Sequence, residues 1–230
     1  MKWNKIGGLL VGVWVMAAGT LSAAEKAVER VAEAAKVLNE VMGTPEHAIP
    51  TDLFNKSQCI AILPGVKKAG LGIGGQFGKG ILSCRIQDGK AWSGPSTVRI
   101  EGGSFGLQIG GSSTDVILLI LNERGAEKLL QSKFTVGVDA AAAAGPVGRD
   151  AKAETDIQMH AEILSYSRSR GAFVGISLDG STLRQDADDN KVIYGKEVTP
   201  QQIVSGAVPR PESVKPLLNA LEKYSPVRAK

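Results

Sequence analysis

Apolar residues in the first part of the chain recur with a helical period. Between residues 25 and 42 they fall every three or four positions, with Glu, Lys and Arg filling the other face: Val28, Val31, Ala35, Leu38 and Met42. This spacing predicts an amphipathic helix over 25–42. Gly43 is a suitable stop, because a helix commonly ends at glycine, and Pro45 lies just beyond. A short helix over 51–57, capped by Thr51 or Asp52, is expected to follow.

From residue 58 to about residue 120, short apolar runs separated by turn residues replace the helical period. The run "QCIAILP" (58–64) predicts a strand that Pro64 ends. The segments "KGILSCRI" (79–86) and "KAWSGPSTVRI" (90–100) flank the turn "QDGK" and predict a hairpin. Strands over 104–111 and 114–121 follow, and the second is apolar throughout, as in a central buried strand.

The remaining chain mixes short helices with further strands. Asn122 is placed to cap a helix over 123–133, and the small-residue stretch 134–151 predicts an ordered loop. Alternating apolar positions predict a half-buried strand over 155–169, and Asp179-Gly180 marks a hairpin turn within 172–186. Helices are expected from Thr199-Pro200 and over 212–224. The order predicts an α+β fold, with an antiparallel sheet or partly closed barrel and flanking N- and C-terminal helices.

The first 24 residues have the layout of a secretory signal peptide. Two lysines in the first five positions precede an uncharged, mostly apolar run, and Ser22-Ala23-Ala24 supplies small residues before Glu25. The prediction is a signal peptide over 1–24 and a single domain over 25–230, exported and periplasmic or peripheral to an envelope membrane. An uncleaved membrane anchor is the alternative reading of the same run.

Charge argues against a nucleic-acid partner. The chain has 27 basic and 23 acidic residues, and without Lys2 and Lys5 the excess falls to about +2. The sequence contains no block of positive charge of the kind that nucleic-acid binding needs.

The stretch "GVKKAGLGIGGQFGKG" (65–80) holds seven glycines. Its Gly70, Gly72 and Gly75 match G-x-G-x-x-G, but a dinucleotide loop requires a helix directly afterwards, and "QFGKGILSCRI" reads as a strand. Glycines that alternate with apolar residues instead predict a strand with one bare face, which lets another strand or a ligand approach the backbone. A second glycine cluster over 102–111 predicts a similar neighbouring strand.

Few residues are candidates for catalysis or metal binding. His47 and His160 occupy polar positions, and Asp186, Asp188 and Asp189 lack the spacing of a calcium loop and read as a solvated acidic turn. The interpretation is a protein that is not an enzyme and takes no metal or cofactor. Cys59 and Cys84 form either a disulfide, as an exported protein permits, or two buried thiols.

Basic residues beside glycine-rich backbone are the more informative group. Five of them are candidate contacts for lipid phosphates, through charge and hydrogen bonds: Lys67, Lys68, Lys79, Arg168 and Arg170. The alternative is that they are ordinary cations in solvated turns.

The segment "ILSYSRSRGAFVGISLDGS" (163–181) resembles the SYLF domain, a lipid-binding module of bacterial exported proteins and of eukaryotic membrane-trafficking and actin-patch proteins. The segments "CIAILPGVKKAGLGIGGQFGKG", "WSGPSTVRIEGGSFGLQIGG", "DVILLILN", "GPVGRDA" and "VIYGKEVTP" are similar to that family in order and spacing. The resemblance covers roughly residues 30–210.

The resemblance implies binding of anionic phospholipid without catalysis. Eukaryotic relatives also bind phosphoinositides and some bind actin, and a basic amphipathic N-terminal helix helps them grip the membrane. The matching helix here has a net charge of about −1 and a face built largely from Ala and Val, which is small for a strong anchor. The hypotheses are therefore a lipid-binding module, with this helix adding apolar contact, or an envelope structural module with a groove for a peptide or an envelope protein.

Overall fold

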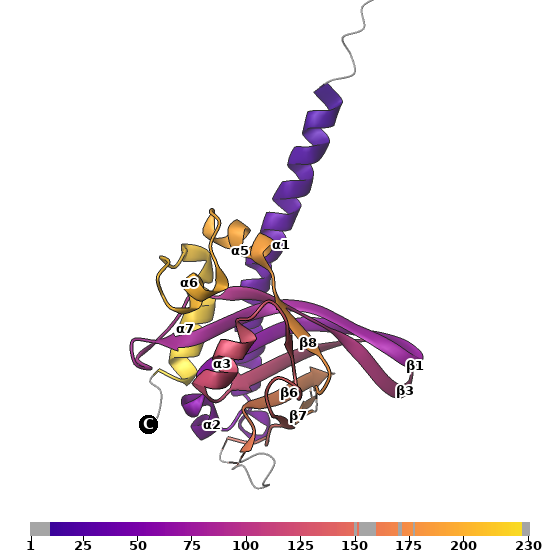
Figure 1. Cartoon of the computed structure of the whole chain (residues 1–230), viewed down its shortest axis with the longest axis vertical. Helices are drawn as coiled ribbons and strands as arrows, with labels where there is room; N and C mark the ends of the chain where they lie inside the picture. Colours follow the sequence, from indigo (N-terminus) through magenta and orange to yellow (C-terminus); the bar gives the residue numbers. More distant parts are fainter. Residues whose placement is uncertain (1–9, 150, 152–159, 170–171, 177, 227–230) are drawn as a thin grey trace, which may run out of the picture.

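The computed structural model describes residues 10–149, 151, 160–169, 172–176 and 178–226. One long helix, α1 (Leu10–Met42), stands along the side of a strongly curled sheet, and its first turns extend beyond the rest of the molecule (Figure 1). The helix runs without a break through Ala24 and Glu25. None of the described helices is both long enough and apolar enough to cross a membrane. Cleavage before Glu25 stays a prediction.

Two very long strands build the sheet. Strand β1 (Cys59–Ile86) pairs antiparallel with β3 (Ser96–Ile120), from Cys59 opposite Ile120 to Leu82 opposite Ser96. A bulge between Leu63 and Val66 lets β1 continue past Pro64, so the expectation that this proline ends the strand is wrong. The segments expected over 104–111 and 114–121 are likewise parts of one strand. The glycine clusters do neighbour each other, with Gly70 opposite Gly110 and Gly75 opposite Gly103.

This two-stranded ribbon bends back on itself, so that the two ends of β1 meet. The amide of Arg85 donates to the carbonyl of Gln58 at 2.8 Å, and Cys59 and Cys84 form a disulfide with 4.0 Å between their Cα atoms. Gly80 lies against the backbone of Ile62 and Leu63, where a side chain would have no room. The bend itself forms the end of the molecule opposite α7 (Figure 1).

Six short strands complete the sheet within the described residues. Strand β6 (Ile163–Ser169) pairs with β3 and carries two others, β5 (Ala142–Ala144) in parallel and β7 (Ala172–Gly175) antiparallel. On the other arm β8 (Thr182–Gln185) pairs with β3, β4 (Phe134–Thr135) with β8, and β2 (Ala91–Trp92) with β1. The α+β expectation is confirmed, as a half-barrel that is mixed because β5 runs parallel to β6.

Short helices fill the connections and the C-terminal region. They are η1 (Pro45–His47), α2 (Thr51–Lys56), α3 (Glu123–Leu129), α5 (Ala187–Tyr194), α6 (Pro200–Val204), η2 (Glu212–Val214) and α7 (Lys215–Tyr224). Asn122 caps α3 through Gly125 and Thr199 forms a capping box on α6, both as expected. Pro50, rather than Thr51 or Asp52, occupies the N-cap position of α2.

Three expectations for the second half are corrected. Strands β7 and β8 do not pair with each other, because β6 and β3 offer them longer partners on opposite arms of the half-barrel. The region 134–151 contains β4 and β5 in addition to loop. The predicted strand 155–169 begins only at Ile163 and is mostly buried, while residues 155–159 lie outside the described part.

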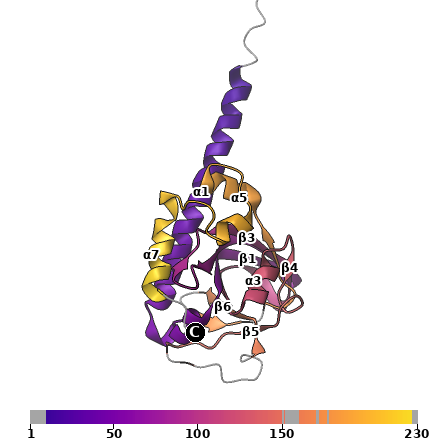
Figure 2. The same ribbon diagram turned by 60° about the vertical axis from the view of Figure 1, so that its left-hand side comes forward.

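The sheet has two faces with separate apolar cores. The outer face packs against α1 and α7, which lie side by side in Figure 2, and it contributes Ile60, Ile62, Ile81, Ile117, Leu119, Leu164 and Tyr166. The inner face lines the half-barrel with Leu63, Val66, Leu82, Val98, Ile100, Val116 and Leu118, together with the disulfide. Because side chains alternate along a strand, these two sets of residues also show on which face the residues next to them in β1 and β3 lie.

Candidate functional site

The outer face continues past the end of α1 toward the bend of the ribbon. Ser113 and Asp115 alternate in register with Ile117, so both belong to this face, and Lys67 is paired with Ser113. The Lys67 side chain is exposed, with its Nζ 3.0 Å from Ser113 Oγ. Lys68 follows it, pairs with Ser112 and is partly exposed. The strands therefore place two predicted cations where the ribbon leaves the body of the protein.

Arg168 lies on the same face but is held by two carboxylates. Strand β6 sets it opposite Asp115, whose Oδ2 accepts from Arg168 Nε at 3.0 Å and from Nη2 at 2.7 Å. Its Nη1 also contacts Glu40 of α1. Partial burial alone would lower the pKa of Arg168, but the hydrogen bonds from Glu40 and Asp115 outweigh it and raise the pKa. Arg168 therefore ties α1 to the sheet and offers less free charge than the sequence suggests.

Lys79 belongs to a second ion-pair group. Its Nζ lies 2.6 Å from Asp186 Oδ2 and 3.0 Å from Asp189 Oδ2, and Arg30 of α1 reaches the same Asp189 oxygen at 2.6 Å. Burial opposes the charge on Lys79, yet the hydrogen bonds to both aspartates raise its pKa. Two cations thus face two carboxylates, and the group is neutral.

The aspartates of this group correct the expectation of a solvated acidic turn. Asp186 is buried and caps α5 by accepting from the amide of Asp189, and both carboxylates take part in ion pairs. The cations that hold them come from α1 and β1, far away in the sequence. Asp188, between them, is exposed.

The four predicted contacts that the structure describes therefore do not form one cluster of free cations. Lys67 and Lys68 lie together at the base of the bend, and Arg168 is near them but paired. Lys79 belongs to the ion-pair group that includes Arg30. Arg30 precedes Glu40, the partner of Arg168, by ten residues, or about 15 Å along the helix. Arg170 lies outside the described residues.

The sequence analysis missed three candidate residues, namely Phe77, Arg99 and Arg184. Phe77 on β1 is 50% exposed. It pairs with Glu101 of β3, which bridges Arg99 at 2.9 Å and Arg184 of β8 at 3.6 Å. The two arginine side chains are 38% and 39% exposed. Strict alternation from Ile81 back to Phe77 would have put Phe77 on the outer face, but no sequence pattern shows that α1 leaves this position uncovered.

The apolar face of α1 is not available for a membrane. Its core residues Val31, Ala34, Leu38 and Val41 are at most 2% exposed and pack against β1, α5 and α7. The expectation that this helix adds apolar contact to a bilayer is therefore wrong for residues 25–42. The small Ala and Val side chains are explained by close packing against the sheet.

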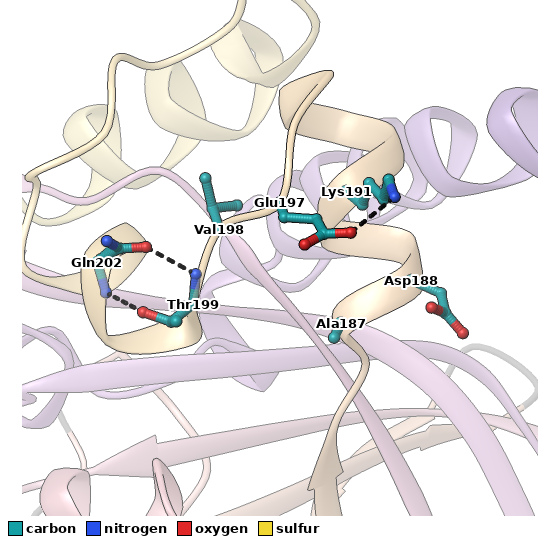
Figure 3. A pocket seen from close by; sticks show the side chains of 7 residues that line it. All are labelled: Ala187, Asp188, Lys191, Glu197, Val198, Thr199 and Gln202. Atoms are coloured by element: carbon teal, nitrogen blue, oxygen red, sulfur yellow. Dashed lines mark hydrogen bonds and ion pairs between the residues drawn. The ribbon is translucent and has the colours of Figure 1, made fainter.

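Two hollows open elsewhere on the described surface. One of about 300 Å³ lies between α5 and α6, where Lys191 pairs with Glu197 at 2.9 Å and Thr199 and Gln202 bond each other (Figure 3). Another, of about 340 Å³, lies between α3, α6 and the disulfide. His160 is exposed, and the described residues contain no group of three His, Cys, Asp or Glu side chains able to hold a metal.

Comparison with known proteins gives a consistent set of relatives. Residues 101–224 match the Ysc84 family, described as "Las17-binding protein actin regulator". Human SH3 domain-containing YSC84-like protein 1 is 32% identical over 199 residues, which cover 84% of this chain and 58% of that protein. LAS seventeen-binding protein 3 of Saccharomyces cerevisiae is 34% identical over 200 residues, which cover 83% of this chain and 43% of that protein. The chain thus spans about half the length of these relatives.

Proposed function

The chain belongs to the Ysc84 family, whose shared SYLF domain is a binding module without catalysis, and we propose that it binds anionic phospholipid at a membrane surface. The observation that carries the proposal is the position of Lys67 on the outer face, with Lys68 next to it on the opposite face, where the ribbon runs out from under α1 toward the bend. Lys67 is exposed, and its Nζ donates to the hydroxyl of Ser113 rather than to a carboxylate. A lysine ammonium in this state is available to lipid phosphates.

Charge around the bend supports a headgroup role. Each lysine or arginine near an anionic membrane surface contributes about 1 kcal/mol, so a few cations on one end of a small domain suffice for reversible binding. Lys67 and Lys68 would make these contacts, while Lys79 and Arg168 act chiefly through the ion pairs that fix α1 and α5 on the sheet. Arg170 remains an additional candidate contact.

The proposal includes export. The layout of residues 1–24 supports a signal peptide, and cutting before Glu25 would leave the α1 residues that pack on the sheet, beginning with Ala27. The protein would then act in the periplasm or on an envelope membrane. Detection of an N-terminus at Glu25 in protein recovered from cells tests this part directly.

A second candidate is a protein-interaction module of the envelope. The hollow beside the disulfide favours it, because α3, α6 and the ends of β1 form a recess that combines charged, polar and apolar walls, for example Glu127, Gln201 and Leu130. The relative LAS seventeen-binding protein 3 is named for binding another protein, which supports the same candidate. Capture of one defined envelope protein, equally before and after lipid depletion, would favour this candidate.

Vesicle co-sedimentation tests the first proposal. The full chain and the chain that begins at Glu25 are each mixed with phosphatidylcholine vesicles, with and without phosphatidylserine, at low and high salt. Binding of both chains to the anionic vesicles, weakened by salt, is the expected result, because salt screens exposed charges. If neither chain sediments with anionic vesicles at low salt, lipid binding is refuted.

A further inference from the structure

We propose that Phe77 enters the interfacial layer of the bilayer and that Arg99 and Arg184 hold phosphates around it. The inference rests on the proposed lipid binding and adds an apolar anchor and two cations to it. It makes the outer face of the ribbon, between α1 and the bend, the side of the protein that meets the membrane.

Phe77 cannot turn into the protein. Its neighbours Gln76 and Gly78 both point inward: Gln76 is buried and bonds Ser181, and a side chain on Gly78 would meet Val66 at 2.7 Å. Alternation along β1 therefore fixes Phe77 on the outer face, where half of its surface is exposed. An aromatic side chain kept in water by its own strand is a ready contact for an apolar surface.

The close approach of Gly78 to Val66 brings the two arms of the ribbon together beside Phe77. A side chain on Gly78 would lie 3.0 Å from the Cα of Val66, so the inner faces of the two arms are in close contact here. Phe77 precedes Gly78, and Lys67 follows Val66. Phe77 and Lys67 both face away from this contact, so it brings the backbones of the two arms together and leaves the two side chains pointing outward from different arms.

Net positive charge lies beside Phe77 across the strands. Glu101, its partner across the strands, is shared between Arg99 and Arg184, so this group carries a net charge of about +1. The next outward position of β1 is Lys79, whose charge Asp186 and Asp189 balance together with that of Arg30. A basic rim around an apolar residue complements a layer with phosphates outside and hydrocarbon beneath.

The same pattern argues for a bilayer over a protein partner. Protein interfaces are centred on clusters of buried anchors, whereas here one aromatic residue projects among long basic side chains. Lysine and arginine stems can lie along the acyl boundary while their charged ends reach phosphates. Removing Phe77 from such a layer should weaken binding about tenfold, since burying part of a phenyl ring contributes over 1 kcal/mol.

The test uses the full chain with vesicles of phosphatidylcholine and phosphatidylserine. In co-sedimentation, Phe77→Ala should bind about tenfold more weakly, Phe77→Leu should retain most of the affinity, and Val138→Ala should match the wild type. Val138 is the control because it is 75% exposed in the connection between β4 and β5. Circular dichroism confirms that each variant is folded.

A fluorescent probe gives an independent readout. Both cysteines of the chain are in the disulfide, so Phe77→Cys and Val138→Cys each provide one free thiol for an environment-sensitive dye. The dye at position 77 should brighten on anionic vesicles and be quenched by lipid-borne quenchers, while the dye at 138 should not respond. If the wild type binds with salt sensitivity but Phe77→Ala binds equally well and position 77 gives no signal, the anchor is refuted and lipid binding stands. If the wild type does not bind, both proposals fall.

Discussion

Replacing Gly80 by alanine tests how the ribbon closes. A Cβ at this position would lie 2.2 Å from the carbonyl oxygen of Ile62 and 2.6 Å from the Cα of Leu63. Both contacts are with backbone, so relief requires the two arms of β1 to move apart. Overpacking of this kind costs typically 1 to 3 kcal/mol, and a clash with backbone belongs at the upper end, about 3 kcal/mol.

The matched control is Gly75→Ala, in the same glycine-rich stretch. A Cβ there would meet only the carbonyl oxygen of Gly102, at an ordinary 3.9 Å, and neither glycine has a left-handed φ. The control should change the free energy of unfolding by less than about 0.5 kcal/mol. For a chain of this size Gly80→Ala should lower Tm by roughly 6 to 12 °C.

Thermal and urea unfolding, followed by circular dichroism, measure both variants against the wild type. A large loss for Gly80→Ala with little change for Gly75→Ala supports close packing of the two arms. Equal stability of the two variants would refute it, because the glycines at the crossing would then have no steric role.

Two other predictions concern the groups that fix the ribbon and α5. Reduction of the Cys59–Cys84 disulfide, which closes a loop with a sequence separation of 25, should lower the free energy of unfolding by about 3 kcal/mol. As a control, dithiothreitol should have no such effect on a variant with serine at both positions. Equal stability of the oxidised and reduced wild type would contradict the prediction. Burial opposes the charge on Lys79, but Asp186 and Asp189 raise its pKa in the folded state above the ordinary 10.5, so the stabilisation of the fold by this charge is complete below pH 10.5 and is lost as pH rises through the folded pKa. Unfolding curves should therefore show the wild type more stable than Lys79→Met at neutral pH, with the difference shrinking above about pH 10.5. A difference that grows above this pH would contradict the prediction.

Local sequence signals predicted much of the fold. Asn122 and Thr199 precede helices for reasons confined to one turn, namely the amides that their side chains satisfy. The glycine-rich stretch was assigned to a sheet because no helix follows it, and the pairing of β1 with β3 bears that out. These inferences required no knowledge of which segments meet in space.

The expectations that were wrong concerned residues whose contacts are far away in the sequence. Pro64 looks like a strand end until β3 continues alongside it past a bulge. Asp186 and Asp189 look solvated until Arg30 and Lys79 approach from other elements. The same limit applies to the candidate site. The sequence analysis treated Arg168 as a cation available to lipid, but its guanidinium donates to the carboxylate of Asp115, 53 positions away.

The most direct test of lipid binding by the bend reverses charge there and, as a control, at the other end of the molecule. Lys67→Glu with Lys68→Glu is compared with Lys215→Glu and Lys223→Glu, two exposed positions on α7 that change net charge equally. Affinity for anionic vesicles at low salt is measured for both. Loss of two lysine contacts, about 2 kcal/mol, predicts at least a thirtyfold decrease for the first pair and a much smaller change for the second. Equal decreases would show that only net charge matters, and no decrease in either would contradict headgroup binding by Lys67 and Lys68.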